Sequence, residues 1–179
     1  MKQLIFSTIL LATLFTSACK KLNKIVQFNL DYKTQVTIPS TTGIDLPFNV
    51  LTPDIETNAQ SSFEANDTRK DLINSIELSK LTLTVKSPQG EDFSFLKSAK
   101  VFIDADGLDE KEVAVIDPVP SNAGSVIELV PTGADLAPYI KADQFTLKVR
   151  TITDEALTRD HTIEVFSRFH VEGRLIGSD

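Results

Sequence analysis

Apolar and polar residues alternate along most of the chain that follows its first twenty residues. Between residues 23 and 39 the apolar side chains share one parity, namely Val26, Phe28, Leu30, Tyr32, Val36 and Ile38. A period of two residues over this length predicts a long half-buried strand, or two strands joined by a bend. Comparable strand patterns recur at 44–50, 76–85, 99–105, 112–117, 125–130, 143–153 and 161–176.

Local signals refine several of these strands. Pro47 cannot donate a backbone hydrogen bond, which predicts that 44–50 is an edge strand. A slip in parity at Ser79 and Lys80 predicts a bulge within 76–85. Asp106 and Gly107, between two apolar runs, predict a tight hairpin turn.

Two short segments have helical spacing instead. Asn66 or Asp67 is placed to cap a helix running to Asn74, and 133–142 predicts one or two further helical turns. The whole pattern predicts an all-β fold, an antiparallel β-sandwich of Ig-like architecture with about seven to nine strands and one or two short helices. The paired cysteines and buried tryptophan of immunoglobulin domains are absent, so the likeness is architectural only.

The first residues have a different composition. Lys2 precedes an apolar run from 4 to 15, and the small residues Thr16, Ser17 and Ala18 lead to Cys19. A charged start, a short apolar run and small residues before a cleavage site are typical of a secretory signal. The run is shorter than the roughly 20 residues needed to span a bilayer core.

Cys19 is the only cysteine in the chain, so it has no internal disulfide partner. The segment resembles a bacterial lipoprotein signal, in which a small residue precedes a cysteine that is acylated and becomes the mature N-terminus. Thr16 stands where this family usually has leucine, a departure common in Bacteroidota-type lipoproteins. The alternative is an ordinary secreted protein with a chance cysteine. The resemblance covers residues 1–21 and implies lipidation of Cys19.

This resemblance implies a domain plan and a location. Residues 1–18 are a cleaved signal, 19–22 an acylated cysteine with a very short tether, and 23–179 a single β-sandwich domain. Lys20 and Lys21 follow the cysteine, and lysine here implies sorting to the outer membrane. The acidic cluster of many surface-exposed lipoproteins is missing, which favours the periplasmic face over surface exposure.

Composition narrows the possible partners. The formal net charge is -7, and an acidic chain argues against nucleic acid as a partner. With no tryptophan and only two tyrosines, the chain is poor in the aromatic platforms that carbohydrate sites use. We expect no cofactor, because no phosphate-binding glycine loop is present, and the serine contexts indicate no catalytic nucleophile.

Three side-chain groups are candidates for chemistry. Alternating carboxylates surround the turn at Gly107 and form a weak calcium candidate, comprising Asp104, Asp106, Asp109 and Glu110. The alternative is a plain hairpin turn, since the EF-hand spacing is not met. His161 and His170 lie nine positions apart on one expected strand, so they should point to opposite faces and cannot share a metal ion. We expect both to be edge or surface histidines.

The third group consists of basic side chains that are concentrated near the C-terminus, namely Lys148, Arg150, Arg159, Arg168 and Arg174. On neighbouring strands they would form a basic strip for an acidic partner, whereas the favoured alternative is cross-strand pairing with Glu155, Glu164 and Glu172.

Three functions remain open at this point. The leading hypothesis is a non-catalytic, lipid-anchored envelope protein that binds or scaffolds another envelope component, for instance through an exposed strand edge near Pro47. The first alternative is a glycan- or lipid-binding module for nutrient capture, which an apolar or aromatic pocket would favour. The second alternative is an enzyme, which would need a cleft with convergent carboxylates or histidines.

Overall fold

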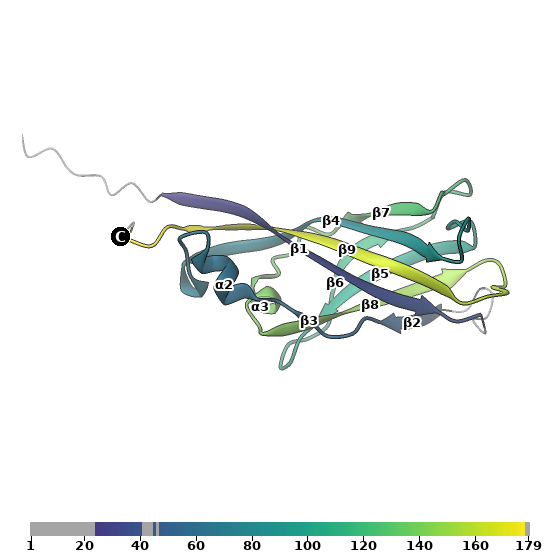
Figure 1. Cartoon of the computed structure of the whole chain (residues 1–179), viewed down its shortest axis with the longest axis horizontal. Coiled ribbons are helices and arrows are strands. Elements are labelled where there is room, and N and C mark those ends of the chain that lie inside the picture. The colour runs from purple at the N-terminus through teal and green to yellow at the C-terminus, as the bar shows by residue number, and fades with distance from the viewer. Residues whose placement is uncertain (1–23, 41–44, 46, 178–179) are drawn as a thin grey trace, which may run out of the picture.

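A computed structural model describes residues 24–40, 45 and 47–177. The elements, in chain order, are β1 (Ile25–Ile38), β2 (Pro47–Leu51), β3 (Ile55–Glu56), α2 (Ala59–Glu64), the 3-10 helix η1 (Lys70–Leu72), β4 (Ile73–Ser87), β5 (Leu96–Asp104), β6 (Lys111–Ile116), β7 (Val126–Pro131), α3 (Ala137–Ile140), β8 (Gln144–Thr153) and β9 (His161–Arg174). The all-β prediction is therefore confirmed (Figure 1).

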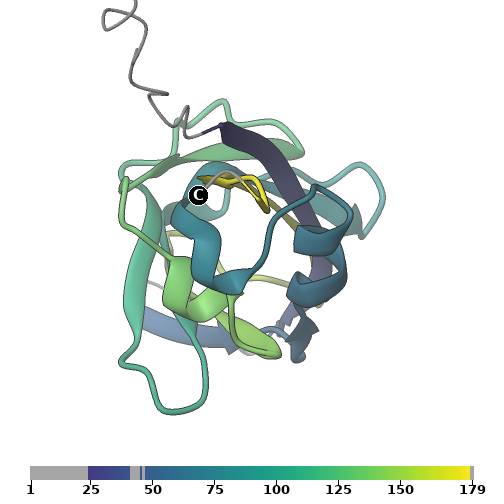
Figure 2. The ribbon, with the colours of Figure 1, turned by 90° about the vertical axis from the view of Figure 1, so that its left-hand side faces the viewer.

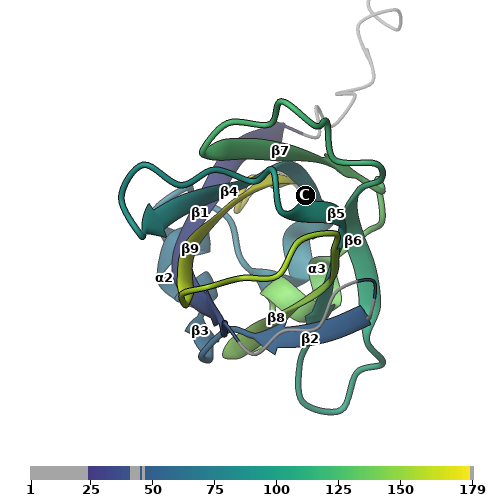
Figure 3. The same cartoon turned by 90° about the vertical axis from the view of Figure 1, so that its right-hand side faces the viewer.

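The strands form one curled antiparallel sheet in the order β1-β9-β4-β7-β6-β5-β8-β2, and β3 adds to β8. Its two halves are joined where β6 pairs with β7 over only two residue pairs. Viewed along the long axis, the strands curl around a common centre (Figure 3). The arrangement is a half-barrel rather than a clear sandwich of two separate sheets.

The core lies inside this curl and is built from the inward-facing parity of each strand. Its largest fully buried side chains are Phe63, Phe93, Phe145, Phe169, Ile76, Leu81, Ile103, Leu129, Leu136, Ile140, Leu147 and Ile163. Strand β9 shows the alternation without a break, since every odd-numbered residue from His161 to Gly173 is buried. Burial of one face of each strand is the main stabilising contribution to such a fold.

The two α-helices close one end of the curl (Figure 2). Phe63 of α2 is fully buried and packs edge-on against Phe28, with ring centroids 6.2 Å apart. Both ends of the described chain lie at this same end, where the backbone N–H of Leu175 donates to the carbonyl of Lys24 at 3.0 Å. Lys24, where the described chain begins, therefore lies at the helical end.

Most local predictions agree with the structure, and one does not. The register shift between Leu78 and Lys80 confirms the bulge in β4, and α3 lies within the predicted helical segment 133–142. The helix predicted to run to Asn74 is wrong, because only η1 forms there and the α-helix lies earlier, at Ala59–Glu64. Strand β4 already begins at Ile73, so its pairing with β9 prevails over the local helical spacing.

Candidate interaction surfaces

Strand β1 is an edge strand of the sheet. It pairs with β9 over all 14 residues without a register shift, and no other strand in the described part of the chain pairs with it. Lys24 and Leu175 continue this register, and the direct backbone bond between them marks a hydrogen-bonded pair. Because such pairs alternate along an antiparallel ladder, the odd-numbered residues of β1 turn their N–H and C=O groups away from β9.

Two side chains beyond β9 confirm this orientation. Arg174 and Arg168 lie opposite the odd-numbered Ile25 and Asp31, and their carbonyls should face away from β1. Thr68 donates its hydroxyl to the carbonyl of Arg174 at 2.7 Å, and Ser79 donates to that of Arg168 at 3.0 Å. Both carbonyls therefore point towards the β4 side, as the alternation requires.

The outward row of β1 comprises Ile25, Gln27, Asn29, Asp31, Lys33, Gln35 and Thr37, and every one of these side chains is exposed. Within the described chain, no backbone or side-chain group bonds to their outward N–H and C=O groups. Neither a proline nor a bulge interrupts the row. Unpaired edges of this length are templates for another strand.

The inner side of β1 is fixed in the core. The Tyr32 ring packs edge-on against Phe145 and Phe169, with centroids 5.3 Å and 5.8 Å away. Its hydroxyl donates to the carbonyl of Thr57 at 2.8 Å, and burial raises the pKa of Tyr32 to about 12. The free edge is therefore held in a defined position by its own inward side chains.

The outer face beside this edge carries an ion pair. Arg168 donates from Nε and NH2 to the two carboxylate oxygens of Asp31, at 2.7 Å and 2.6 Å. The hydrogen bond from Arg168 is the main reason that the pKa of Asp31 lies below its usual range. Burial opposes this shift with the next largest effect, and the charges of Arg168 and Lys33 lower the pKa by smaller amounts. Lys33 places its Nζ 5.9 Å from the centre of the outward-facing Phe166 ring.

Strand β2 is the second edge of the sheet and confirms the prediction made from Pro47. Among the described residues it pairs with β8 alone, over Pro47–Leu51. The hydrogen bond from the Thr52 N–H to the Leu147 carbonyl shows that the even-numbered residues of β2 turn their backbone N–H and C=O groups towards β8. Its outward row is then Pro47, Asn49 and Leu51, and Pro47 has no N–H to offer.

The basic residues near the C-terminus do not form one strip. Strands β8 and β9 are consecutive in the chain but lie in opposite halves of the sheet, with four strands between them in one direction. Four of the five cations also pair with carboxylates other than the predicted Glu155, Glu164 and Glu172. Lys148 and Arg150 pair with Glu110, Arg159 with Glu91 at 2.5 Å, and Arg168 with Asp31.

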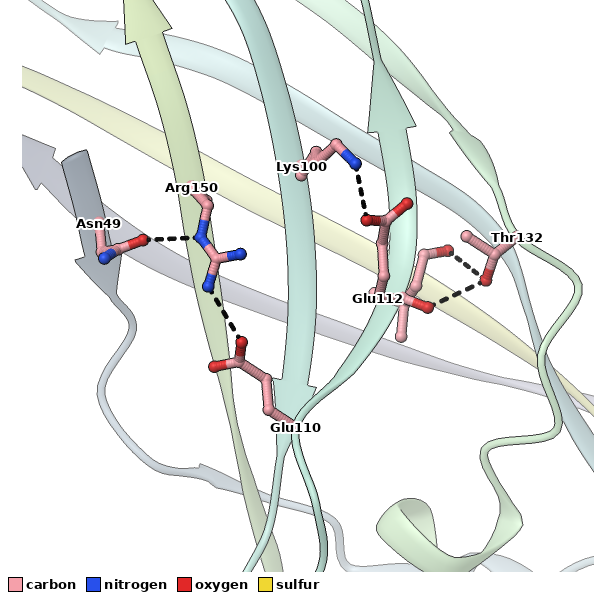
Figure 4. A network of polar contacts seen from close by, with 7 residues as sticks. Asn49, Lys100, Glu110, Glu112, Thr132 and Arg150 are labelled. Atoms are coloured by element: carbon pink, nitrogen blue, oxygen red, sulfur yellow. Dashed lines mark hydrogen bonds and ion pairs between the residues drawn. The ribbon is translucent and has the colours of Figure 1, made fainter. Parts of the chain in front are cut away.

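On the β8 half these contacts form a network (Figure 4). Arg150 donates to Asn49 on β2 and to Glu110, each at 3.2 Å, while its guanidinium lies 4.3 Å from the centre of the Phe102 ring. Lys100 donates to Glu112 at 3.0 Å. Cations and carboxylates therefore satisfy one another on this face, which leaves no unopposed basic surface among these residues.

The structure does not bring the four calcium candidates together. Asp104 and Asp106 line an open pocket of about 350 Å³ with Asp54, whereas Glu110 faces Lys148 and Arg150. The hydroxyl of Tyr139 donates to the backbone carbonyl of Asp109 at 2.5 Å. In the described part of the chain, no three His, Cys, Asp or Glu side chains form a group that could hold a metal ion. The Asp106-Gly107 turn connects β5 and β6, as a hairpin turn does.

The two histidines lie on opposite faces of β9, as predicted. His170 is half-buried on the outer face, near Asn29. The expectation of an edge or surface position is wrong for His161, which is only 4% exposed and packs against Phe95 with ring centroids 4.8 Å apart. Its Nδ1 lies 2.9 Å from the Arg159 carbonyl. The inward parity of β9 explains this burial.

Two further features bear on ligand binding and membrane attachment. The apolar cavity between β1 and β2, near Val36 and Val50, has a volume of about 10 Å³, room for one water molecule at most. The larger pockets are open and polar, and Phe145 at one of them is 1% exposed.

No helix among the described residues has the length and apolarity to cross a bilayer. Cys19, the predicted lipidation site, lies outside the described residues, as do Lys20 and Lys21.

Comparison with known proteins provides no functional assignment. No family model and no curated protein matches the chain. A solved chain from Desmodium yellow mottle tymovirus aligns with 84% of this chain and 90% of its own length, at 10% sequence identity and a TM-score of 0.29. A similarity at this level supports no inference about function.

Proposed function

We propose that this protein is a non-catalytic, lipid-anchored envelope protein that binds another component of the cell envelope by strand pairing along the free edge of β1. The observation that carries the proposal is the outward row of β1, which presents unpaired backbone groups from Ile25 to Thr37. In strand addition, main-chain hydrogen bonds supply affinity and the side chains that alternate along the edge supply specificity.

The position of β1 in the chain supports this role. Four residues separate the candidate lipidation site Cys19 from Lys24, so the start of β1 lies within about 20 Å of an acylated residue 19. Exposed apolar side chains also cluster at this end, where Ile25 is 60% and Ile176 54% exposed. An anchor at Cys19 would place the β1 edge at the membrane, in reach of neighbouring anchored proteins.

The anchor is tested by Cys19→Ala in the full chain. The variant should leave the membrane fraction and lose labelling by radioactive palmitate, because no other cysteine is present to accept an acyl group. Labelling equal to that of the unaltered chain would contradict the lipoprotein assignment.

The edge is tested by photocrosslinking in intact envelopes with the anchor retained. A photoreactive residue at Asn29, on the outward row, should crosslink to protein. The same residue at Thr84, on the outer face of β4 and within the sheet, is the matched control. Crosslinks to protein from both positions alike, or to lipid alone from Asn29, would contradict the proposed use of the β1 edge.

A further inference from the structure

The outward row of β1 is complementary to itself in one register. When two identical strands pair antiparallel about a two-fold axis, the residue at the axis faces its own copy and its neighbours exchange partners. Near the middle of β1 the axis can pass through Asp31, Tyr32 or Lys33. In each case the odd-numbered residues, whose backbone groups face the edge, pair with one another.

Charge separates these three registers. An axis at Asp31 sets two aspartates opposite each other, and an axis at Lys33 sets two lysines opposite each other. Like charges directly opposite on neighbouring strands are unfavourable. An axis at Tyr32 instead sets each Asp31 opposite Lys33 of the second copy, and Asn29 opposite Gln35. This register contains two pairs of opposite charges and no like-charged pair directly opposite.

We propose that the partner of the β1 edge is a second copy of this chain, paired antiparallel about an axis at Tyr32, with Asp31 of each copy opposite Lys33 of the other. This inference rests on the proposed function and names the partner at that site. The two sheets would become one continuous sheet across the β1 strands.

The side chains are placed for this contact. Arg168 already holds Asp31 on the outer face from the β9 side, which leaves the β1 side open for a second cation. Lys33 is exposed and forms no ion pair within the described residues. Strand β2 lies beside the C-terminal end of β1 (Figure 1), so the ladder we propose runs only from Asn29 to Gln35.

Membrane anchoring would strengthen such a contact. A single pair of edge strands forms a small interface, which by itself gives weak association. Two copies held on one membrane meet at a high effective concentration, so a weak contact is sufficient there. The proposal therefore predicts association that is measurable in solution only at high protein concentration.

The register can be tested by exchanging charges. Asp31→Lys sets lysine opposite lysine in its own dimer, and Lys33→Asp sets aspartate opposite aspartate, so each variant alone should associate about tenfold or more weakly than the unaltered chain. In a mixture of the two variants every charged pair is again of opposite sign. We expect the mixture to recover the affinity of the unaltered chain to within about threefold.

The measurement is sedimentation velocity of the full chain in a large molar excess of detergent micelles, with thermal unfolding of each variant followed in parallel. Lys86→Asp, with the same charge change on β4 away from the edge, is the matched control and should not alter association. Gln35→Pro should abolish it without unfolding the domain, because the N–H it removes faces the free edge.

The outcomes separate cleanly. Recovery in the mixture, with weak association of each variant alone, supports the proposal. An unaltered chain that stays monomeric at several hundred micromolar, equal association of all variants, or a mixture that does not recover would overturn it. The proposed function and this inference can fail separately. Crosslinks from Asn29 to a different protein would support the β1 edge as a binding site and would contradict a second copy as its partner.

Discussion

The two edges of the sheet differ in what they offer another chain. Strand β1 has 14 residues in unbroken register with its neighbour, whereas β2 has five and begins with Pro47. The outward row of β1 therefore provides a longer and more complete set of backbone donors and acceptors. A proline and a short length are two ways in which proteins block an edge strand. Only β2 uses them here.

The inner faces of the two strands differ as well. Leu30, Val36 and Ile38 of β1 are 8%, 5% and 4% exposed, while Phe48 and Val50 of β2 are only half-buried. Strand β1 is thus fixed by the core and presents a rigid edge, and β2 is a more loosely packed closing strand. A rigid edge loses less conformational entropy when a partner strand pairs with it. The comparison identifies β1 as the better docking strand.

The largest expected effect comes from proline at adjacent positions of β1. Thr34→Pro removes an N–H that pairs with β9 and should lower the free energy of unfolding by about 3 kcal/mol or more. Gln35→Pro removes an N–H that faces the free edge and should cost about 1 kcal/mol or less. Urea unfolding of both variants measures the difference. Equal costs would contradict the backbone orientation of β1.

The packing of the two strands is compared by alanine substitution. Leu30→Ala leaves a cavity in the core and should cost about 3 kcal/mol. Val50→Ala removes a smaller and half-exposed side chain and should cost about 1 kcal/mol. Denaturant midpoints of the two variants provide the test, and a larger loss for Val50→Ala would reverse the assignment of the more firmly held edge.

Tyr32 provides a pH-dependent test of the β1 anchorage. Burial favours the neutral phenol, so the folded protein keeps this proton to about pH 12, while the unfolded chain loses it near the ordinary pKa of about 10. The contribution of the neutral Tyr32 phenol to the free energy of unfolding is therefore complete below about pH 10 and is lost as the pH rises towards 12. Tyr32→Phe should cost about 1 kcal/mol at pH 7 by removing the bond to Thr57.

Ultraviolet absorbance measures this titration directly. Only two tyrosines are present, so comparison of the unaltered chain with Tyr32→Phe assigns the change. A Tyr32 that ionises at its ordinary pKa would show that the inner side of β1 is open to water.

The ion pair on the outer face of β1 should have the smallest effect. Arg168 holds the pKa of Asp31 below its unfolded value, so the stabilisation is present above about pH 4 and disappears as the pH falls through the lowered pKa. Both side chains are 42% exposed, and Asp31→Asn should cost only about 0.5 kcal/mol at pH 7. Urea unfolding at pH 7 and pH 2 measures it, and a loss that is equal at both pH values would contradict the charge pairing.

Period-two alternation explains why so much of the fold could be predicted. It placed β1, β8 and β9 within a few residues, because one face of each strand is buried along its whole length. It could not place α2, whose only large buried side chain is Phe63, because a six-residue helix has too few apolar positions to show a helical period.

The candidate site was less accessible to sequence reasoning. Pro47 correctly indicated one edge, but nothing in the local pattern of β1 distinguishes an edge strand from a central one. Strand order depends on contacts between distant segments, such as Ile25 with Arg174. The same limit explains the basic residues, since the chain order of β8 and β9 suggested neighbours and the sheet separates them. The polar residues at every odd position from Gln27 to Thr37 indicate an exposed face of the strand, but they do not indicate an edge.

Residue-resolved amide hydrogen exchange of the full chain in micelles tests the central claim most directly. In dilute protein, the even-numbered amides of β1 should be protected and the odd-numbered amides should exchange freely, because only the former are bonded to β9. At high concentration, the odd-numbered amides from Asn29 to Gln35 should become protected, while Asn49 and Leu51 of β2 remain free. Equal protection of odd and even amides in the dilute protein, or odd amides of β1 that stay free at every concentration, would contradict the account.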